Sequence, residues 1–135
     1  MNIMQMENGI MNITQENKEL LFKDLSVRLP YHVRVKVWLK DGTTEEGVLD
    51  LEHNYADVLR DAFYYNKIID IKPYLRPMSS MTLEEEREYN LTKTLSIVDY
   101  PTLESFDWLN AHHFDYRGLI EKGLALEAPE GMYNS

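Results

Sequence analysis

The chain has 135 residues, of which 44% are hydrophobic and 27% are charged, so its composition is that of one ordinary globular domain rather than of a disordered, collagen-like or coiled-coil protein. It contains no cysteine, which excludes disulfides, thiolate metal sites and cysteine nucleophiles and fits a reducing compartment. The formal net charge of −9 repels phosphate backbones, so nucleic acid is not the partner we expect.

Hydropathy and the start of the chain indicate a cytoplasmic protein. No apolar run approaches the ~20 residues of a membrane-spanning helix, and the start lacks a basic region followed by an apolar stretch. We therefore expect no processing and no membrane contact. Residues 1–13 hold four methionines in a weak pattern, and we expect a flexible N-terminus there. Residues 14–135 should form a single α+β domain, with a helix and a β-sheet in 14–77 and a helical part and tail in 78–135.

The first predicted element is an amphipathic helix over residues 14–28. Its apolar side chains recur every three to four positions, as a buried helix face requires, and they are Leu21, Phe22, Leu25 and Leu29. Pro30 has no amide hydrogen and disfavours helix at the residue before it, so the helix should end near Arg28.

Strict alternation of apolar and polar residues predicts a half-buried strand over residues 33–40. Its apolar positions are Val33, Val35, Val37 and Leu39. Asp41 and Gly42 then favour a tight hairpin turn, because this pair tolerates positive φ angles. Residues 43–52 should return as a second strand, in which Gly47 marks a bulge or a sharp bend.

Two shorter strands are expected over residues 55–60 and 67–75. Pro73 and Pro77 cannot donate hydrogen bonds to a neighbouring strand, so the piece between them should lie at a sheet edge or leave the sheet. The loop 62–66 between these strands is unusually aromatic for a connection.

The pattern changes to helix at Thr82, which forms a capping box with Glu85. This helix should run to about residue 95 and bury its leucines, which are Leu83, Leu91 and Leu95.

Two further helices are expected nearer the C-terminus. Pro101 suits the first turn of one, and Asp115 is placed to cap a short one over residues 116–122 that Gly123 ends. The fold class is therefore α+β, with an N-terminal helix, a small curved antiparallel sheet of the SH3-like or Sm-like barrel kind, and two or three C-terminal helices.

The cluster that most resembles a metal site is His112 with His113 and Asp115, because imidazole and carboxylate groups are common ligands of zinc and iron. Adjacent residues on a helix point about 100° apart, so the alternative is that both histidines lie in the last helical turn and face its negative end. We expect no bound metal and no cofactor. No serine stands in a Gly-x-Ser-x-Gly context and no glycine-rich phosphate loop is present, so we expect no catalytic residue.

Aromatic residues are abundant, and tyrosine and arginine are the residue types that dominate protein interfaces. The chain has nine tyrosines, several of them in predicted loops. Our candidates for contact with a partner are Tyr64, Tyr65, Tyr74, Arg76, Tyr116, Arg117 and Tyr133. An alternative for Phe114 and Tyr116 is that they fill the join between the helical and β parts.

Three stretches resemble a group of short uncharacterised proteins encoded in Bacteroidetes genomes and their mobile elements. They are KPYLRPMSSMT at residues 72–82, NAHHFDYRGLI at 110–120 and LALEAPEGMY at 124–133. The resemblance implies a bacterial or phage-related intracellular setting and supplies no catalytic residue.

A second resemblance concerns architecture. VKVWLKDG at residues 35–42, GVL at 47–49 and LRDA at 59–62 look like the first half of an Sm-like barrel, a family that implies RNA binding on an oligomeric ring. The usual spacing of the base-binding asparagine and the later arginine-glycine turn are missing. We therefore expect the barrel shape rather than the RNA function.

These observations predict a non-enzymatic protein-binding or regulatory module of unknown biological role, with a protein partner and possible homo-oligomers. Two alternatives remain open. One is an RNA-binding Sm-like barrel, which would need a local basic patch. The basic residues closest to clustering are Arg34, Lys36 and Lys40 on one predicted strand and Lys67, Lys72 and Arg76 on another. The other is a small metal-dependent enzyme that uses the histidine pair.

Overall fold

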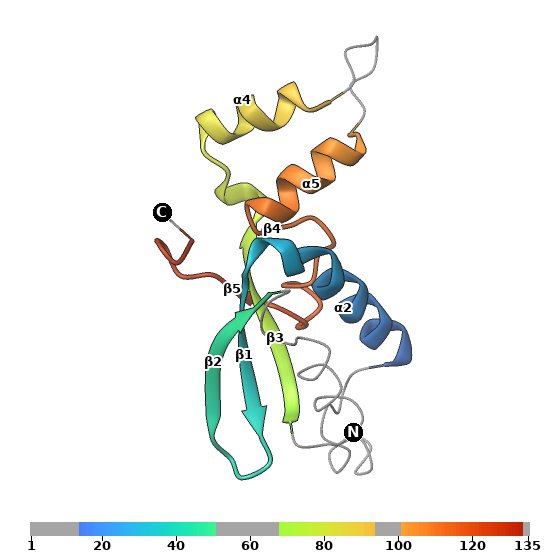
Figure 1. Cartoon of the computed structure of the whole chain (residues 1–135), viewed down its shortest axis with the longest axis vertical. Coiled ribbons are helices and arrows are strands. Elements are labelled where there is room, and N and C mark those ends of the chain that lie inside the picture. The colour runs from blue at the N-terminus through green and yellow to red at the C-terminus, as the bar shows by residue number, and fades with distance from the viewer. Residues whose placement is uncertain (1–13, 51–67, 94–100, 134–135) are drawn as a thin grey trace.

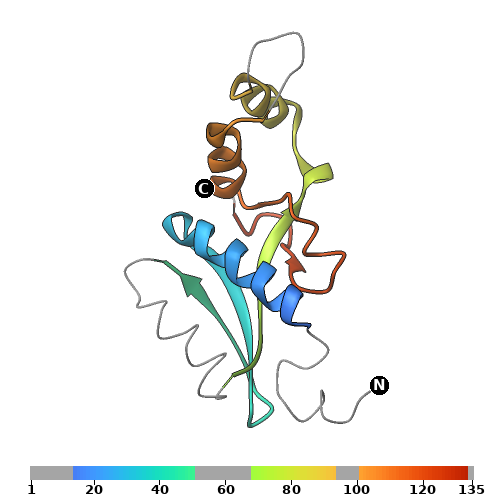
Figure 2. The same ribbon diagram turned by 90° about the vertical axis from the view of Figure 1, so that its right-hand side faces the viewer.

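The computed structural model describes residues 14–50, 68–93 and 101–133 (Figure 1). Its first helix, α2 (Gln15–Arg28), lies across a β-sheet, whereas the helices α4 (Leu83–Leu91) and α5 (Leu103–Ala111) lie together at one end of the molecule (Figures 1 and 2). The predicted α+β class and the N-terminal helix are confirmed.

Helix α2 begins and ends where local chemistry predicts. The Thr14 side chain accepts a hydrogen bond from the Asn17 amide at 3.0 Å and so caps the first turn. After Arg28 the chain tightens into the 3₁₀ turn η1 (Leu29–Tyr31), which contains Pro30. His32, with a φ of 55°, then redirects the backbone into the first strand.

The hydrophobic core lies between α2 and the sheet. Leucines of α2 pack on valines of β1 (Val33–Leu39) and on apolar residues of β3 (Ile68–Pro77), and the chain after α5 closes one side. The buried members are Leu21, Leu25, Leu29, Val33, Val35, Leu49, Ile71, Leu75, Leu119, Leu124 and Ala125. The predicted helix face and the predicted strand alternation therefore both point into one core.

The predicted hairpin joins β1 to β2 (Thr44–Leu49) in antiparallel register. Gly42 takes a φ of 91°, and the Asp41 carboxylate accepts the Thr43 amide at 2.9 Å, which closes the turn. Of the two alternatives expected at Gly47, a bulge or a sharp bend, the bulge is wrong, because the pairing with β1 runs through Gly47 without a shift. The register shift occurs instead between Trp38 and Leu39, where β1 pairs with β3.

Strand β3 is central rather than at an edge, which corrects the expectation drawn from its prolines. It pairs with β1 on one edge, and its last residues pair in parallel with β4 (Phe114–Asp115). Pro73 is the last residue paired with β1, and Pro77 is the last residue paired with β4. Each proline therefore stands where a ladder ends, so the missing amide hydrogen interrupts no continuing ladder.

The sheet is mixed, with five strands, and it is not closed among the described residues. The Arg76 amide donates to the His113 carbonyl of the segment entering β4, whereas the Leu75 carbonyl accepts from Ala128 just after β5 (Leu126–Glu127). Because backbone groups of successive strand residues point to opposite edges, β4 and β5 flank β3 on its two sides. The antiparallel sheet that we expected is correct only for β2, β1 and β3. The strand expected at residues 55–60 lies outside the described residues.

The C-terminal part contains α4 and α5, each begun by a capping box, at Thr82 with Glu85 and at Thr102 with Ser105. Helix α4 ends at Leu91, and its leucines are not buried as we expected: Leu83 is 76% exposed and Leu91 is 81% exposed. Leu95 lies outside the described residues. Pro101 precedes the N-cap of α5 instead of standing in its first turn.

The short helix expected over residues 116–122 is wrong, because this segment consists of turns. Gly118 takes a φ of 74°, which a right-handed helix does not allow. Asp115 nevertheless caps the segment, since its two carboxylate oxygens each accept an amide at 2.9 Å, from Leu119 and Ile120. Gly123 has the expected positive φ.

Candidate functional site

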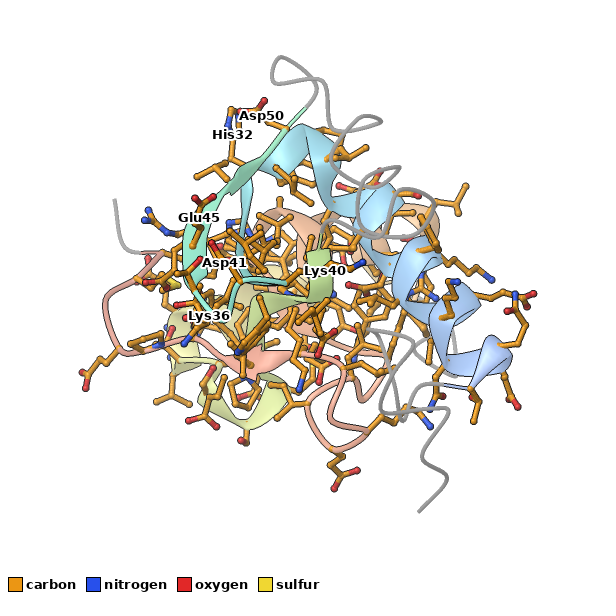
Figure 3. All side chains as sticks on the ribbon, turned by 90° about the horizontal axis from the view of Figure 1, so that it is seen from below. His32, Lys36, Lys40, Asp41, Glu45 and Asp50 are labelled. Atoms are coloured by element: carbon orange, nitrogen blue, oxygen red, sulfur yellow. The ribbon has the colours of Figure 1, made fainter. Side chains whose placement is uncertain are left out.

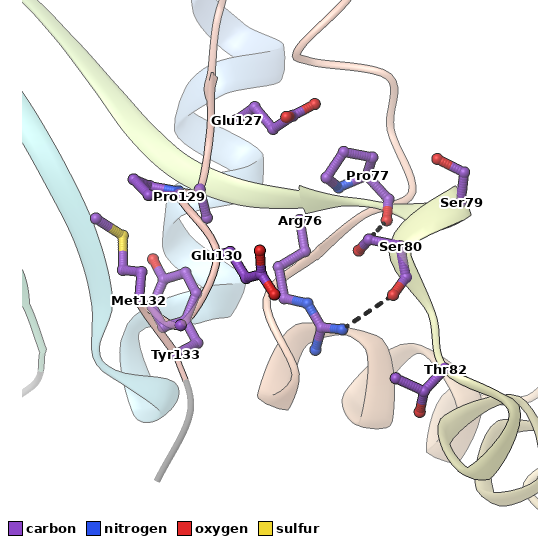
Figure 4. Close-up of a pocket in the computed structure, with 12 residues that line it drawn as sticks. Arg76, Pro77, Ser79, Ser80, Thr82, Glu127, Pro129, Glu130, Met132 and Tyr133 are labelled. Atoms are coloured by element: carbon purple, nitrogen blue, oxygen red, sulfur yellow. Dashed lines mark hydrogen bonds between the residues drawn. The ribbon is translucent and has the colours of Figure 1, made fainter.

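A pocket of about 550 Å³ opens between the end of β3 and the C-terminal segment (Figure 4). Arg76, Pro77 and the 3₁₀ turn η2 (Met78–Ser80) form one wall, and residues 127–133 form the other. Two of the stretches that resemble the Bacteroidetes proteins, residues 72–82 and 124–133, therefore meet at one site. The third contributes β4, which pairs with Arg76 and Pro77.

Arg76, one of the predicted contact residues, is held inside this site by an acid that the sequence alone did not connect with it. Two of its nitrogens donate to the two carboxylate oxygens of Glu85, both at 2.7 Å, and its guanidinium lies 4.1 Å over the ring of Phe114. The hydrogen bonds from Arg76 lower the pKa of Glu85 to about 2. The pair therefore stays charged at neutral pH and ties the end of β3 to the first turn of α4.

Tyr133 holds the other wall of the pocket, residues 127–133, against the sheet. The chain turns after β5, with a φ of 86° at Gly131, and returns so that the Tyr133 hydroxyl donates to the Tyr74 carbonyl at 2.7 Å and accepts from the Arg34 amide at 2.9 Å. Burial raises the pKa of Tyr133 to about 12. Tyr133 thus spans the tail and the sheet, and its hydroxyl is not free for a ligand.

The remaining charge of the pocket is negative. The Arg76 charge is matched by Glu85, whereas Glu127 and Glu130 are exposed on the rim and form no ion pair with any other described residue. The apolar part of the lining includes Pro77, Pro129, Met132 and Tyr133. The pocket therefore suits a group with an apolar body and a positive or hydrogen-bond-donating end.

Tyr116 and Arg117, which we predicted as contact residues, are partly exposed and take part in a network that reaches into the core. Arg117 lies 3.2 Å from a carboxylate oxygen of Asp24, and the Tyr116 hydroxyl donates to Asn110 at 2.9 Å. Asp24 also accepts two hydrogen bonds from Arg28, with both side chains fully buried. The alternative reading of Phe114 and Tyr116 as filling between the helical and β parts fits this arrangement, since Phe114 is completely buried.

Two other predicted contact residues, Tyr64 and Tyr65, lie outside the described residues. Tyr74 is partly buried on β3, and its pKa is raised by a hydrogen bond to Glu46 of β2. It therefore contributes to cross-strand contacts in the sheet.

The histidine pair does not converge on one point. The Nδ1 atom of His112 lies 2.8 Å from the Trp108 carbonyl and its ring stacks on Trp108, whereas the His113 ring stacks on Tyr133. Both Asp115 oxygens are occupied by backbone amides. His32 pairs with Asp50 elsewhere, 3.1 Å apart (Figure 3). Among residues 14–50, 68–93 and 101–133, no three acidic or histidine side chains gather closely enough to hold a metal.

A second surface lies on the β-sheet around Trp38. The amino groups of Lys36 and Lys72 lie 5.4 and 5.6 Å from the centre of the Trp38 ring, and both lysines are partly exposed. Figure 3 labels Lys36 on β1 and Glu45 on β2, together with Lys40 and Asp41 of the turn that joins these strands. Lys36 and Lys72 are cross-strand partners, so the Trp38 ring lies beside a pair of lysines. The Lys72 amino group also lies 3.9 Å from the Asp70 carboxylate.

Comparison of the chain with protein-family models, with curated proteins and with solved structures found no match. In the part of the chain that the structure describes, no helix is both long enough and apolar enough to cross a membrane.

Sequence reasoning did not assign the acids at this site, which are Glu127 and Glu130 in the pocket lining and Glu85 as the partner of Arg76. The capping box placed Glu85 at a helix start but carried no information about Arg76, which lies on a strand nine positions earlier. Glu127 and Glu130 resembled ordinary surface charge, because only the pairing of β5 with β3 brings them beside η2.

Proposed function

We propose that the protein is a non-enzymatic protein-binding or regulatory module of the cytoplasm, and that the pocket beside Arg76 receives part of its partner. The observation that carries this proposal is the composition of the pocket, which combines a proline, methionine and tyrosine wall with an exposed acidic rim. An apolar centre bounded by polar groups is the usual anatomy of a recognition site. Its polar anchors, Arg76 and Tyr133, are already fixed by internal hydrogen bonds, so the walls are preorganised.

The charge of the pocket favours a basic partner. With Arg76 matched by Glu85, a lysine or arginine side chain of the partner would lay its stem along Pro129 and direct its charge to Glu127 and Glu130. Surface charge pairs of this kind steer association and select the partner more than they add affinity.

The same proposal places the chain with the short proteins of Bacteroidetes genomes and mobile elements. Supporting it is the convergence of the three stretches that carry the resemblance, residues 72–82, 110–120 and 124–133, around the pocket and the adjoining strand β4.

The test is affinity purification of the tagged full chain from its native cell, with protein and nucleic acid both identified. Glu127→Lys with Glu130→Lys should abolish recovery of a partner that the wild-type chain retains. The matched control is Glu45→Lys with Glu121→Lys, which changes the charge equally at two exposed residues outside the pocket lining. If both double variants lose the partner equally, the binding depends on net charge and not on the pocket. If both recover the partner as well as the wild type does, the pocket is not the binding site.

RNA binding is a second candidate, favoured by the Trp38 ring beside Lys36 and Lys72. Bases stack on exposed aromatic rings while neighbouring cations contact the phosphates. The Sm-like or SH3-like barrel shape goes with this candidate, and the antiparallel strands β2, β1 and β3 supply a curved core on which such a shape could be built.

Retention on a mixed RNA pool at increasing salt separates the two candidates. If the chain binds RNA, retention should fall as the salt concentration rises. In the double variant Lys36→Ala with Lys72→Ala, the slope of log affinity against log salt concentration should become shallower by about 2. Lys23→Ala with Lys122→Ala, at two exposed lysines away from Trp38, should leave the slope unchanged. No retention at low salt would rule RNA binding out.

A further inference from the structure

Helix α4 is a short helix without a buried side chain. It has nine residues, and none of them is buried. Isolated helices of this length are not stable in water, and most helical stability in proteins comes from packing of an apolar face. In most helices such leucines are packed against a neighbouring element, whereas in α4 they are exposed.

The inner side of α4 is already occupied. Glu85 pairs with Arg76 at 2.7 Å, and the Tyr89 ring lies 5.6 Å from the Trp108 ring of α5. These two contacts and the capping box at Thr82 hold the helix in place. On the opposite side of α4, no contact with another element is seen within residues 14–50, 68–93 and 101–133.

Leu83, Arg87 and Leu91 form a stripe on that opposite side, because they follow one another at four-residue spacing. Both leucines are more than three-quarters exposed. A groove of about 340 Å³ runs along the neighbouring side of α4, with Met78, Met81 and Tyr89 as its apolar lining. Its polar lining is Ser79, Glu86, Asn90 and Lys93. The leucine stripe and this methionine groove therefore lie next to each other on α4, whose place at one end of the molecule is seen in Figures 1 and 2.

The charges around the stripe decide among possible occupants. Four of the five charged side chains of α4 are glutamates, and only Glu85 is paired with Arg76. Nucleic acid and anionic membranes would be repelled by Glu84, Glu86 and Glu88. A second copy would bring the same acids against themselves, in a chain whose net charge is −9. A basic amphipathic helix of another protein would cover the leucines with its apolar face and pair its positive charges with the glutamates.

We infer that the stripe Leu83–Arg87–Leu91, with its flanking glutamates, is a docking surface for a basic amphipathic helix of a partner protein. The partner helix would place leucine-like side chains on the stripe and in the methionine groove, and lysines or arginines against Glu84 and Glu88. This surface is separate from the rim acids of the pocket. Either proposal can therefore fail while the other stands.

The test uses a synthetic helical peptide with leucines on one face and lysines on the other. Its control peptide has the same composition in an order that forms no apolar face. Binding to the full chain is measured by fluorescence anisotropy at physiological salt. The ordered peptide should bind, and Leu83→Gln with Leu91→Gln should weaken its binding at least about tenfold, since two leucine contacts are lost.

The matched control is Leu103→Gln on α5, which removes an equally exposed leucine outside the stripe and should leave binding unchanged. Thermal unfolding of each variant verifies that these exposed substitutions leave the fold intact. Glu127→Lys with Glu130→Lys should also leave peptide affinity within about twofold, which separates this surface from the pocket.

Four results would overturn the inference. Equal binding of both peptides, or equal binding to the wild type and the double leucine variant, would mean attraction by bulk charge alone. No binding of the ordered peptide would remove the surface. Light scattering that shows a dimer of the wild type and a monomer of the double variant would assign the stripe to a second copy.

Discussion

The Arg28 side chain donates to both carboxylate oxygens of Asp24, at 2.7 and 3.1 Å, and neither side chain has any exposed surface. The same guanidinium donates to the Phe114 carbonyl at 2.7 Å, which joins α2 to β4 across the core. Arg117 adds a second cation, 3.2 Å from Asp24. One buried carboxylate thus holds together the N-terminal helix, the strand β4 and the turn that follows it.

Replacing Asp24 by asparagine should destabilise the fold by about 3 to 5 kcal/mol, because it leaves the Arg28 charge buried without an anion. The measurement is urea unfolding followed by circular dichroism. Glu16→Gln in the exposed first turn of the same helix is the control and should cost less than about 1 kcal/mol. A loss for Asp24→Asn as small as that of the control would mean that water reaches the pair.

A second prediction concerns Glu85, which is bound to Arg76 and also caps the Thr82 amide at 3.0 Å. Glu85→Gln should lower the free energy of local opening of α4 by about 1 to 3 kcal/mol, because the Arg76 cation then faces a neutral amide instead of a carboxylate. Hydrogen exchange should show faster exchange of α4 amides and unchanged exchange in β1. Glu86→Gln, at the next, exposed residue, is the control. Similar exchange in both variants would show that Arg76 does not hold α4.

The elements that the sequence predicted well are those whose signals are local. The β1–β2 hairpin follows from an alternation and an Asp-Gly turn, and α2 follows from its leucine spacing and Pro30. Strands β4 and β5 have two residues each, too few for any periodicity, and both exist only because β3 lies beside them.

Burial was the least predictable property. The leucines of α2 and those of α4 look alike in the sequence, but Leu25 is fully buried whereas Leu91 is exposed. A helical pattern identifies an apolar face without saying what covers it. For the same reason Arg76 and Tyr133 were named from residue type, while their internal partners Glu85 and Tyr74 depend on contacts distant in the chain.

The last prediction uses His113, which is packed on Tyr133 with its ring centre 3.7 Å away. Burial lowers the pKa of His113 to about 4, with a further contribution from the nearby charge of Arg28. Its ordinary pKa is 6.5, so between pH 6.5 and 4 the unfolded chain binds a proton that the folded chain excludes. The stability that the neutral ring supplies is therefore complete above pH 6.5 and is lost as the pH falls towards 4, by up to about 3 kcal/mol.

The variant that isolates this effect is His113→Asn, since asparagine tolerates the positive φ of 64° at this position. Unfolding free energies measured at pH 7 and pH 5 should differ less in His113→Asn than in the wild type, because the shifted histidine is gone while the carboxylates still titrate. His32→Asn is the matched control: it also replaces a histidine with positive φ, but one that is 62% exposed. An identical pH dependence in all three proteins would mean that protonated His113 is accommodated beside Tyr133, and that the tail does not depend on a neutral ring to stay packed on the sheet.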